Sequence, residues 1–162
     1  MEKQIEKWID EFVSVHNEAL GSVPCPYARS ALTRYEETQN IGESLANTLN
    51  NWSDDVHVVV IHTATENYTP EELQSIVKQF NTIAMSHDVV ALEDHPDDEE
   101  NINGVKMNFG KCILVLVQRL SVINRKSLAL KDQGYYDNWS EDNLNDVVNW
   151  RFKWVTHTQE LI

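Results

Sequence analysis

The stretch VHVVVIHTATENYTPEELQSIVKQFNTIAMSHDVVAL, residues 56–92, decides the fold of this chain. It begins with the apolar run Val56–Ile61, which is continuous rather than alternating and so predicts a strand buried on both faces. Thr69 and Glu72 form a capping box that predicts the start of a helix. Another apolar run, Val89–Leu92, predicts a further strand. The order strand, helix, strand is typical of a right-handed crossover between parallel strands.

The same alternation continues on both sides of this stretch. The expected strands are Leu32–Glu37, Val56–Ile61, Val89–Leu92 and Lys111–Val117, with a short extra hairpin at the Asn103-Gly104 turn. Helical spacing predicts further helices over Ile5–Ala19, from Asn40 through Leu49, over Leu120–Lys131, and from Ser140 through Arg151 to Val155. We therefore predict an α/β or α+β fold, in which helices pack on a single, four-stranded, mostly parallel sheet. One domain is expected to cover residues 1–162.

Composition limits the class of protein. The chain has 162 residues, 41% of them hydrophobic, which is typical of a globular protein with a real core. Its net charge of −13 argues against direct binding to nucleic acid, because an acidic surface repels phosphates. Such a charge could mimic nucleic acid or simply keep the protein soluble. No apolar run is long enough to span a membrane, and no secretory signal is recognisable, so we expect a cytoplasmic protein.

Reactive side chains lie where the predicted elements end. His62 closes the second strand and His95 follows the third, so both should leave the C-terminal edge of the sheet, where open α/β folds place their sites. Cys25 lies between two prolines before the first strand and should begin at the opposite edge. Two interpretations are open for all three. They are catalytic groups, or they are a packed thiol and two hydrogen-bonded structural histidines.

The second cysteine, Cys112, lies in an apolar run and is expected to be buried and inert. Cys25 differs from it because Arg29 follows four residues later and would favour a thiolate. A disulfide between the two cysteines is not expected in a reducing compartment.

The densest group of ionisable residues follows the third strand. His95 opens a segment that contains Asp97 and Asp98, and carboxylates with imidazole suit a divalent metal such as Mn, Fe or Zn. We therefore predict His62, His95, Asp97 and Asp98 as candidate metal ligands. The alternative interpretation is a solvated acidic loop without a metal.

Basic residues gather after the fourth strand, on the segment that contains Arg119, Arg125, Lys126 and Lys131. We expect Arg29 and Arg119 to bind a substrate carboxylate or phosphate, although these cations could equally balance the acidic loop. The C-terminal segment is rich in aromatic residues, most of which should pack in the core.

Short motifs along the chain resemble a bacterial family, domain-of-unknown-function family 1415. The matching pieces are Trp8 in the first helix, Cys25-Pro-Tyr-Ala-Arg29, Val58-Val-Val-Ile-His62, His95-Pro-Asp-Asp98 and the strand Lys111–Arg119. The family has Phe where this chain has Tyr27, and its His-Pro loop differs in detail. The resemblance implies positions rather than a reaction, and it groups Cys25, His62 and His95 in one site.

Two classes of function follow from these observations. The first is a small enzyme or metal-binding protein that acts on a small molecule, with Cys25, His62 and His95 as catalytic residues and Asp97 or Asp98 as added ligands or bases. The second is a non-catalytic acidic interaction protein, or an inhibitor, that binds a basic partner surface. The enzyme hypothesis requires the thiol and the imidazoles to converge in one pocket.

Overall fold

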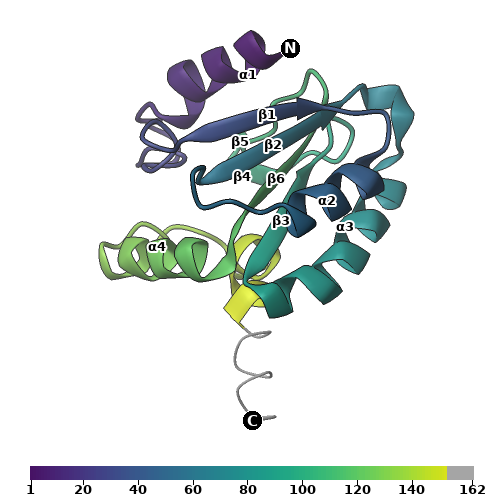
Figure 1. Cartoon of the computed structure of the whole chain (residues 1–162). Helices are drawn as coiled ribbons and strands as arrows, with labels where there is room; N and C mark the ends of the chain where they lie inside the picture. Colours follow the sequence, from purple (N-terminus) through teal and green to yellow (C-terminus); the bar gives the residue numbers. More distant parts are fainter. Residues whose placement is uncertain (153–162) are drawn as a thin grey trace.

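A four-stranded sheet runs through the computed structural model, which describes residues 1–152 (Figure 1). The strands are β1 (Thr33–Glu37), β2 (Val58–Thr63), β3 (Val89–Asp94) and β6 (Ile113–Arg119), and their order across the sheet is β1-β2-β6-β3. β1 and β2 are parallel, whereas β6 is antiparallel to both of its neighbours, β2 and β3. The sheet is therefore mixed, and the prediction of a mostly parallel sheet was wrong.

The connection between β3 and β6 explains this difference. It contains the hairpin of β4 (Asn101–Ile102) and β5 (Val105–Lys106), and it contains no helix. A parallel return usually needs a helical crossover, whereas an antiparallel return does not. The Asn103-Gly104 turn predicted from the sequence forms this hairpin, with φ values of 53° and 83°. Because only β6 is reversed, β1, β2 and β3 still run in one direction, as predicted.

Helices cover both faces of the sheet (Figure 1). α2 (Ile41–Asn50) and α3 (Pro70–Ala84) lie on one face, which we call the α2/α3 face. We call the other side of the sheet the α1/α4 face. It carries α1 (Glu2–Trp8) with the π-helical turn η1 (Ile9–Val13), and then α4 (Leu120–Asp132), α5 (Glu141–Leu144) and the π-helical turn η4 (Asn145–Asn149). The short 3-10 turns η2 (Thr65–Asn67) and η3 (Met85–His87) flank α3.

Local signals account for most helix boundaries. The side chain of Thr69 accepts a hydrogen bond from the backbone N–H of Glu72, whose carboxylate accepts one from the backbone of Thr69, so the predicted capping box begins α3. Asn40 caps α2 in a similar way. The first helical segment ends at Val13 and not at Ala19 as expected, and residues 14–32 form turns instead. The predicted Val155 lies outside the described residues.

The two faces of the sheet differ in how completely they are packed. On the α2/α3 face, buried side chains of α2, α3 and the strands form one continuous cluster that includes Leu45, Leu73, Val77, Ile61 and Val115. On the α1/α4 face, α1 packs over Val60 and Leu114, and α4 packs near Val90. Because α1 and α4 cover separate parts of this face, the sheet between them is left without a helix (Figure 1).

The described residues form a single domain around this sheet. Among residues 1–152, no helix is both long and apolar enough to cross a membrane.

Candidate functional site

The C-terminal edge of the sheet carries both predicted histidines. His62 pairs with Leu114 of β6, and Leu114 pairs on its other side with Asp94, the residue before His95. Two strand spacings of about 4.8 Å place the backbones of His62 and Asp94 roughly 10 Å apart. The prediction that the two histidines leave the same edge is confirmed.

His95 is held by backbone groups on both sides of its ring. It is only 3% exposed, and its Nε2 lies 2.7 Å from the carbonyl oxygen of Tyr68. The backbone N–H of Asp97 donates to its Nδ1 at 3.0 Å. This arrangement fits the tautomer with the proton on Nε2, which donates to the Tyr68 carbonyl. With both nitrogens engaged, His95 ties the end of β3 to the loop before α3 and has no ring nitrogen left for a metal.

His62 is buried on the α1/α4 face, on the same side of β2 as Val60. Burial lowers the pKa of its imidazole, and the carboxylate of Glu37 opposes this shift only in part. The burial of His62 therefore disfavours the charged form of its imidazole.

The acidic loop after β3 is organised by one amide side chain, that of Asn108. Its Nδ2 donates to a carboxylate oxygen of Asp94 at 2.7 Å and to the carbonyl oxygens of His95 and Asp98 at 3.2 Å and 3.1 Å. Its Oδ1 accepts from the backbone N–H of Glu100. Asp97 and Asp98 themselves are exposed. Within residues 1–152, no three His, Cys, Asp or Glu side chains lie close enough to hold a metal ion.

The two predicted substrate-binding arginines already have partners. The guanidinium of Arg119 forms two hydrogen bonds with Asp54, at 2.9 Å and 3.2 Å, and lies over the ring of Trp52. The hydrogen bonds from Arg119 hold the pKa of the Asp54 carboxyl below its usual value. Arg29 is exposed and donates to the carbonyl oxygen of Asp10 at 3.4 Å.

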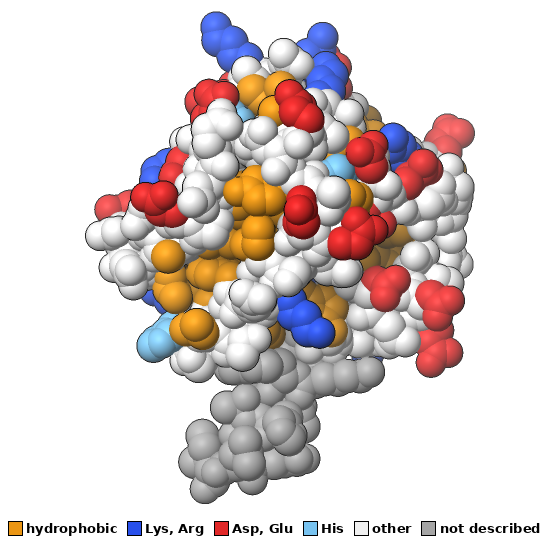
Figure 2. Space-filling model, turned by 90° about the vertical axis from the view of Figure 1, so that its right-hand side faces the viewer, with side chains coloured by type: hydrophobic (Ala, Val, Ile, Leu, Met, Phe, Trp, Pro, Cys, Tyr) orange, Lys and Arg blue, Asp and Glu red, His pale blue; other side chains and the backbone are white. Residues whose placement is uncertain are grey.

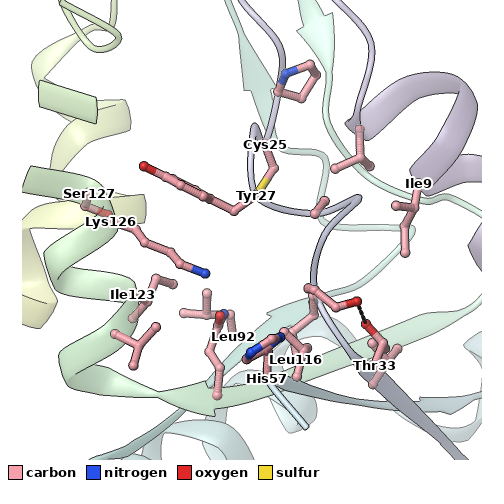
Figure 3. A pocket seen from close by; sticks show the side chains of 18 of the residues that line it. Ile9, Cys25, Tyr27, Thr33, His57, Leu92, Leu116, Ile123, Lys126 and Ser127 are labelled. Carbon is pink, nitrogen blue, oxygen red and sulfur yellow. Dashed lines mark hydrogen bonds between the residues drawn. The ribbon is translucent and has the colours of Figure 1, made fainter. Parts of the chain in front are cut away.

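A cavity of about 590 Å³ occupies the part of the α1/α4 face that the helices leave uncovered (Figure 3). We call it the sheet cavity. Its floor is formed by strand residues such as Val58, Leu92 and Leu116, one wall by Trp8 and Ile9, and the opposite wall by α4. Figure 3 shows Ile9, Leu92, Leu116 and Ile123 around an open space. The volume lies within the range of about 300–1,000 Å³ typical of small-molecule sites.

Cys25 lines this cavity from a segment that connects its two walls. The backbone N–H of Cys25 donates to the carbonyl oxygen of Val13 at 2.9 Å, which fixes the segment to η1. The hydroxyl of Tyr135, just beyond α4, donates to the carbonyl oxygen of Pro24. The Cys25 thiol is partly exposed, whereas Cys112 is 3% exposed and burial raises the pKa of its thiol to about 11.

The structure brings Cys25 to the sheet cavity but not the two predicted histidines. Neither His62 nor His95 lines it, because both lie at the C-terminal edge of the sheet, and Cys25 enters from the opposite edge. His57 lines the cavity instead. It directly precedes β2, and its Nδ1 accepts a hydrogen bond from the backbone N–H of Leu32 at 2.9 Å.

Two cationic side chains of the sheet cavity lie on α4 and beyond it. The ammonium of Lys126 extends from α4 into the space that Tyr27 faces, 4.8 Å from the centre of the Tyr27 ring (Figure 3). Arg151 follows η4 and is 2% exposed. Its Nη atoms donate to Asn124 and Ser127 of α4, both at 3.2 Å, and its Nε has no hydrogen-bond partner within the described residues 1–152.

Sequence reasoning missed His57 and Arg151. His57 lies within the expected strand Val56–Ile61, where alternation would place it on the opposite face from His62; in the structure it lies just outside β2, where alternation does not apply. Arg151 shared the helical spacing of apolar residues such as Val147 and Val148. A charged residue at an apolar position of a helix is the signal that could have identified it.

The opposite side of the molecule differs in character. Figure 2 shows the side on which α2 and α3 lie, where acidic side chains, in red, are spread among apolar and uncharged ones. This distribution agrees with the net charge of −13.

Comparisons of this chain with protein-family models, with curated proteins and with solved structures found no match. The resemblance to domain-of-unknown-function family 1415 therefore stays a prediction.

Proposed function

We propose that this protein binds a small, mainly apolar molecule in the sheet cavity. The observation that carries this proposal is the cavity itself, about 590 Å³ between the sheet, the α1 segment and α4. A folded protein normally fills such a space with side chains, because its interior is close-packed. A cavity of this size with apolar walls is therefore the expected form of a ligand site.

The aromatic and aliphatic side chains of the cavity support the same proposal. Trp8, Tyr27 and Trp139 line it together with branched aliphatic residues of the strands and α4. Burying a ligand against them would release water from apolar surface, at about 25 cal/mol per Å². The predicted small-molecule ligand is retained here, whereas the predicted metal is not part of this proposal.

Cys25 would lie beside the bound molecule, since its thiol belongs to the cavity lining. We therefore assign Cys25 to ligand contact, in place of a catalytic group shared with His62 and His95.

The test uses N-phenyl-1-naphthylamine, an uncharged probe whose fluorescence rises in apolar surroundings. The wild-type protein should bind it saturably. Leu116→Trp should weaken binding at least about tenfold, a difference of about 1.4 kcal/mol, because the larger side chain fills the cavity floor. The control is Ile83→Trp on α3, where Ile83 is 61% exposed and outside the cavity.

Equal probe binding by Leu116→Trp and the wild-type protein would contradict the proposal, provided that both unfold cooperatively at similar temperatures. The Ile83→Trp protein should match the wild type, since its new indole lies on the α2/α3 side.

A further inference from the structure

The charges that line the sheet cavity have the opposite sign to the chain as a whole. The chain has 26 acidic and 13 basic residues. Arg119, Lys126 and Arg151 nevertheless line the cavity, and Asp54 is the only carboxylate among the described residues that does so. Asp54 is bonded to Arg119. Two cations, Lys126 and Arg151, thus remain without a carboxylate partner within residues 1–152.

Lys126 is placed to meet a ligand. Its side chain is partly buried, and its ammonium reaches the space between α4 and Tyr27 (Figure 3). The Tyr27 ring holds the ammonium by a cation–π contact, which occupies one side of the group only. An anion in the cavity could therefore approach Lys126 without breaking an existing ion pair.

Arg151 adds a second positive charge in surroundings of low polarity. It is 2% exposed, and its partners Asn124 and Ser127 are neutral. Burial lowers the pKa of its guanidinium, and among the residues described no carboxylate opposes this shift. An unpaired buried cation destabilises a fold, and a nearby anion would offset that cost. The field of Arg151 acts over a longer distance here than it would in water.

We propose that the ligand of the sheet cavity is an amphipathic organic acid, with its apolar body over the sheet and its carboxylate at Lys126. This inference rests on the proposed function and adds the chemical class of the ligand. Lys126 contacts the carboxylate directly, and Arg151 supplies positive potential from its buried position beside Asn124 and Ser127 of α4. A neutral or cationic ligand of the same shape would leave both charges uncompensated.

Calorimetric titration with decanoate and with decanamide tests this inference, because the two probes share an alkyl chain and differ in charge. The wild-type protein should bind decanoate about tenfold more tightly than decanamide, the difference expected of one charge-assisted contact. Lys126→Met should remove most of that difference in affinity, because it weakens the binding of decanoate but not that of decanamide. Arg151→Met should weaken the binding of decanoate by about threefold and leave the affinity for decanamide unchanged. Lys131→Met, an exposed α4 lysine outside the cavity, is the matched control and should change neither.

Two results would overturn the inference in distinguishable ways. Equal affinity for decanoate and decanamide, with the uncharged fluorescent probe still bound, would refute the anionic ligand and leave the proposed function in place. Failure to bind the fluorescent probe and both decanoyl compounds would refute the proposed function as well. A loss of decanoate binding in Lys131→Met equal to that in Lys126→Met would show a general charge effect and would also overturn the inference.

Discussion

Replacing Arg151 by methionine should stabilise the folded protein while it weakens the binding of an anionic ligand. The guanidinium is 2% exposed and has two neutral hydrogen-bond partners but no carboxylate within residues 1–152. Within the described part of the chain, removing the guanidinium leaves no partner charge behind. This differs from breaking a buried ion pair, which destabilises by about 3–5 kcal/mol.

The magnitude follows from opposing contributions. Arg151→Met loses two hydrogen bonds from a charged donor, at roughly 1.5–3 kcal/mol each. It removes the desolvation of a buried ion, which costs several kcal/mol, and the unsatisfied Nε–H, which costs about 1–3 kcal/mol. Methionine also fills most of the same volume with apolar atoms. The balance favours the variant by about 1 kcal/mol, which corresponds to a rise in Tm of roughly 2–4 °C.

Thermal and urea unfolding without ligand measure this difference. Arg125→Met, at an exposed position of α4, is the control and should change stability by less than about 0.5 kcal/mol. If Arg151→Met lowers the free energy of unfolding by more than about 2 kcal/mol while the control leaves it unchanged, the reasoning is refuted. Such a fall would mean that the two hydrogen bonds outweigh the desolvation of the guanidinium.

Three further predictions concern groups away from Arg151. A thiol reagent should label Cys25 before Cys112, and decanoate should protect Cys25; equal labelling rates would place both thiols in the core. Burial lowers the pKa of His62, so the unfolded chain takes up a proton first, and stability should fall as the pH drops below about 6.5. Urea titrations at about pH 7.5 and 5.5 measure this fall in the free energy of unfolding. The fall should be smaller in His62→Gln than in His16→Gln, which is an exposed control. An equal fall in the two variants would contradict the prediction. Asn108→Ala should lower the unfolding free energy by about 2–3 kcal/mol and expose the acidic loop to proteolysis, whereas an intact loop would show that its four hydrogen bonds are dispensable.

The sequence predicted those parts of the fold that depend on local signals. The capping box at Thr69, the hairpin at Asn103-Gly104 and the common direction of β1, β2 and β3 all follow from short patterns. The direction of β6 does not, because an apolar run reads the same in either orientation. The absence of a helical pattern between β3 and β6 was the available indication of an antiparallel return.

The candidate site was harder to predict because its members are far apart in the chain. Cys25 was identified, but its neighbours in the cavity come from η1, the strands, α4 and the segment after η4. No spacing rule joins them. A void is also not visible in a sequence, since it arises where α1 and α4 fail to meet over the same sheet face.

The predicted histidines show why residue type at a strand end is an incomplete guide to chemistry. Loop backbones at such ends carry N–H and C=O groups that need partners, and polar side chains often supply them. His95 does this for Tyr68 and Asp97, and Asn108 does it for the acidic loop. The same residues that suggested a metal site at this edge are engaged in holding its loops together.

Arg151 differs from those residues in a way that bears on function. The hydrogen bonds of His95 satisfy backbone groups that would otherwise be unpaired, so the fold gains from that side chain. Arg151 instead bonds to the side chains of Asn124 and Ser127, and its own Nε has no partner among residues 1–152. A buried cation without a carboxylate partner in the described part of the chain points to a role in function, because natural proteins break local rules mainly at functional sites. Its position on an apolar cavity, in a chain of net charge −13, fits the proposed role, the attraction of an anionic ligand.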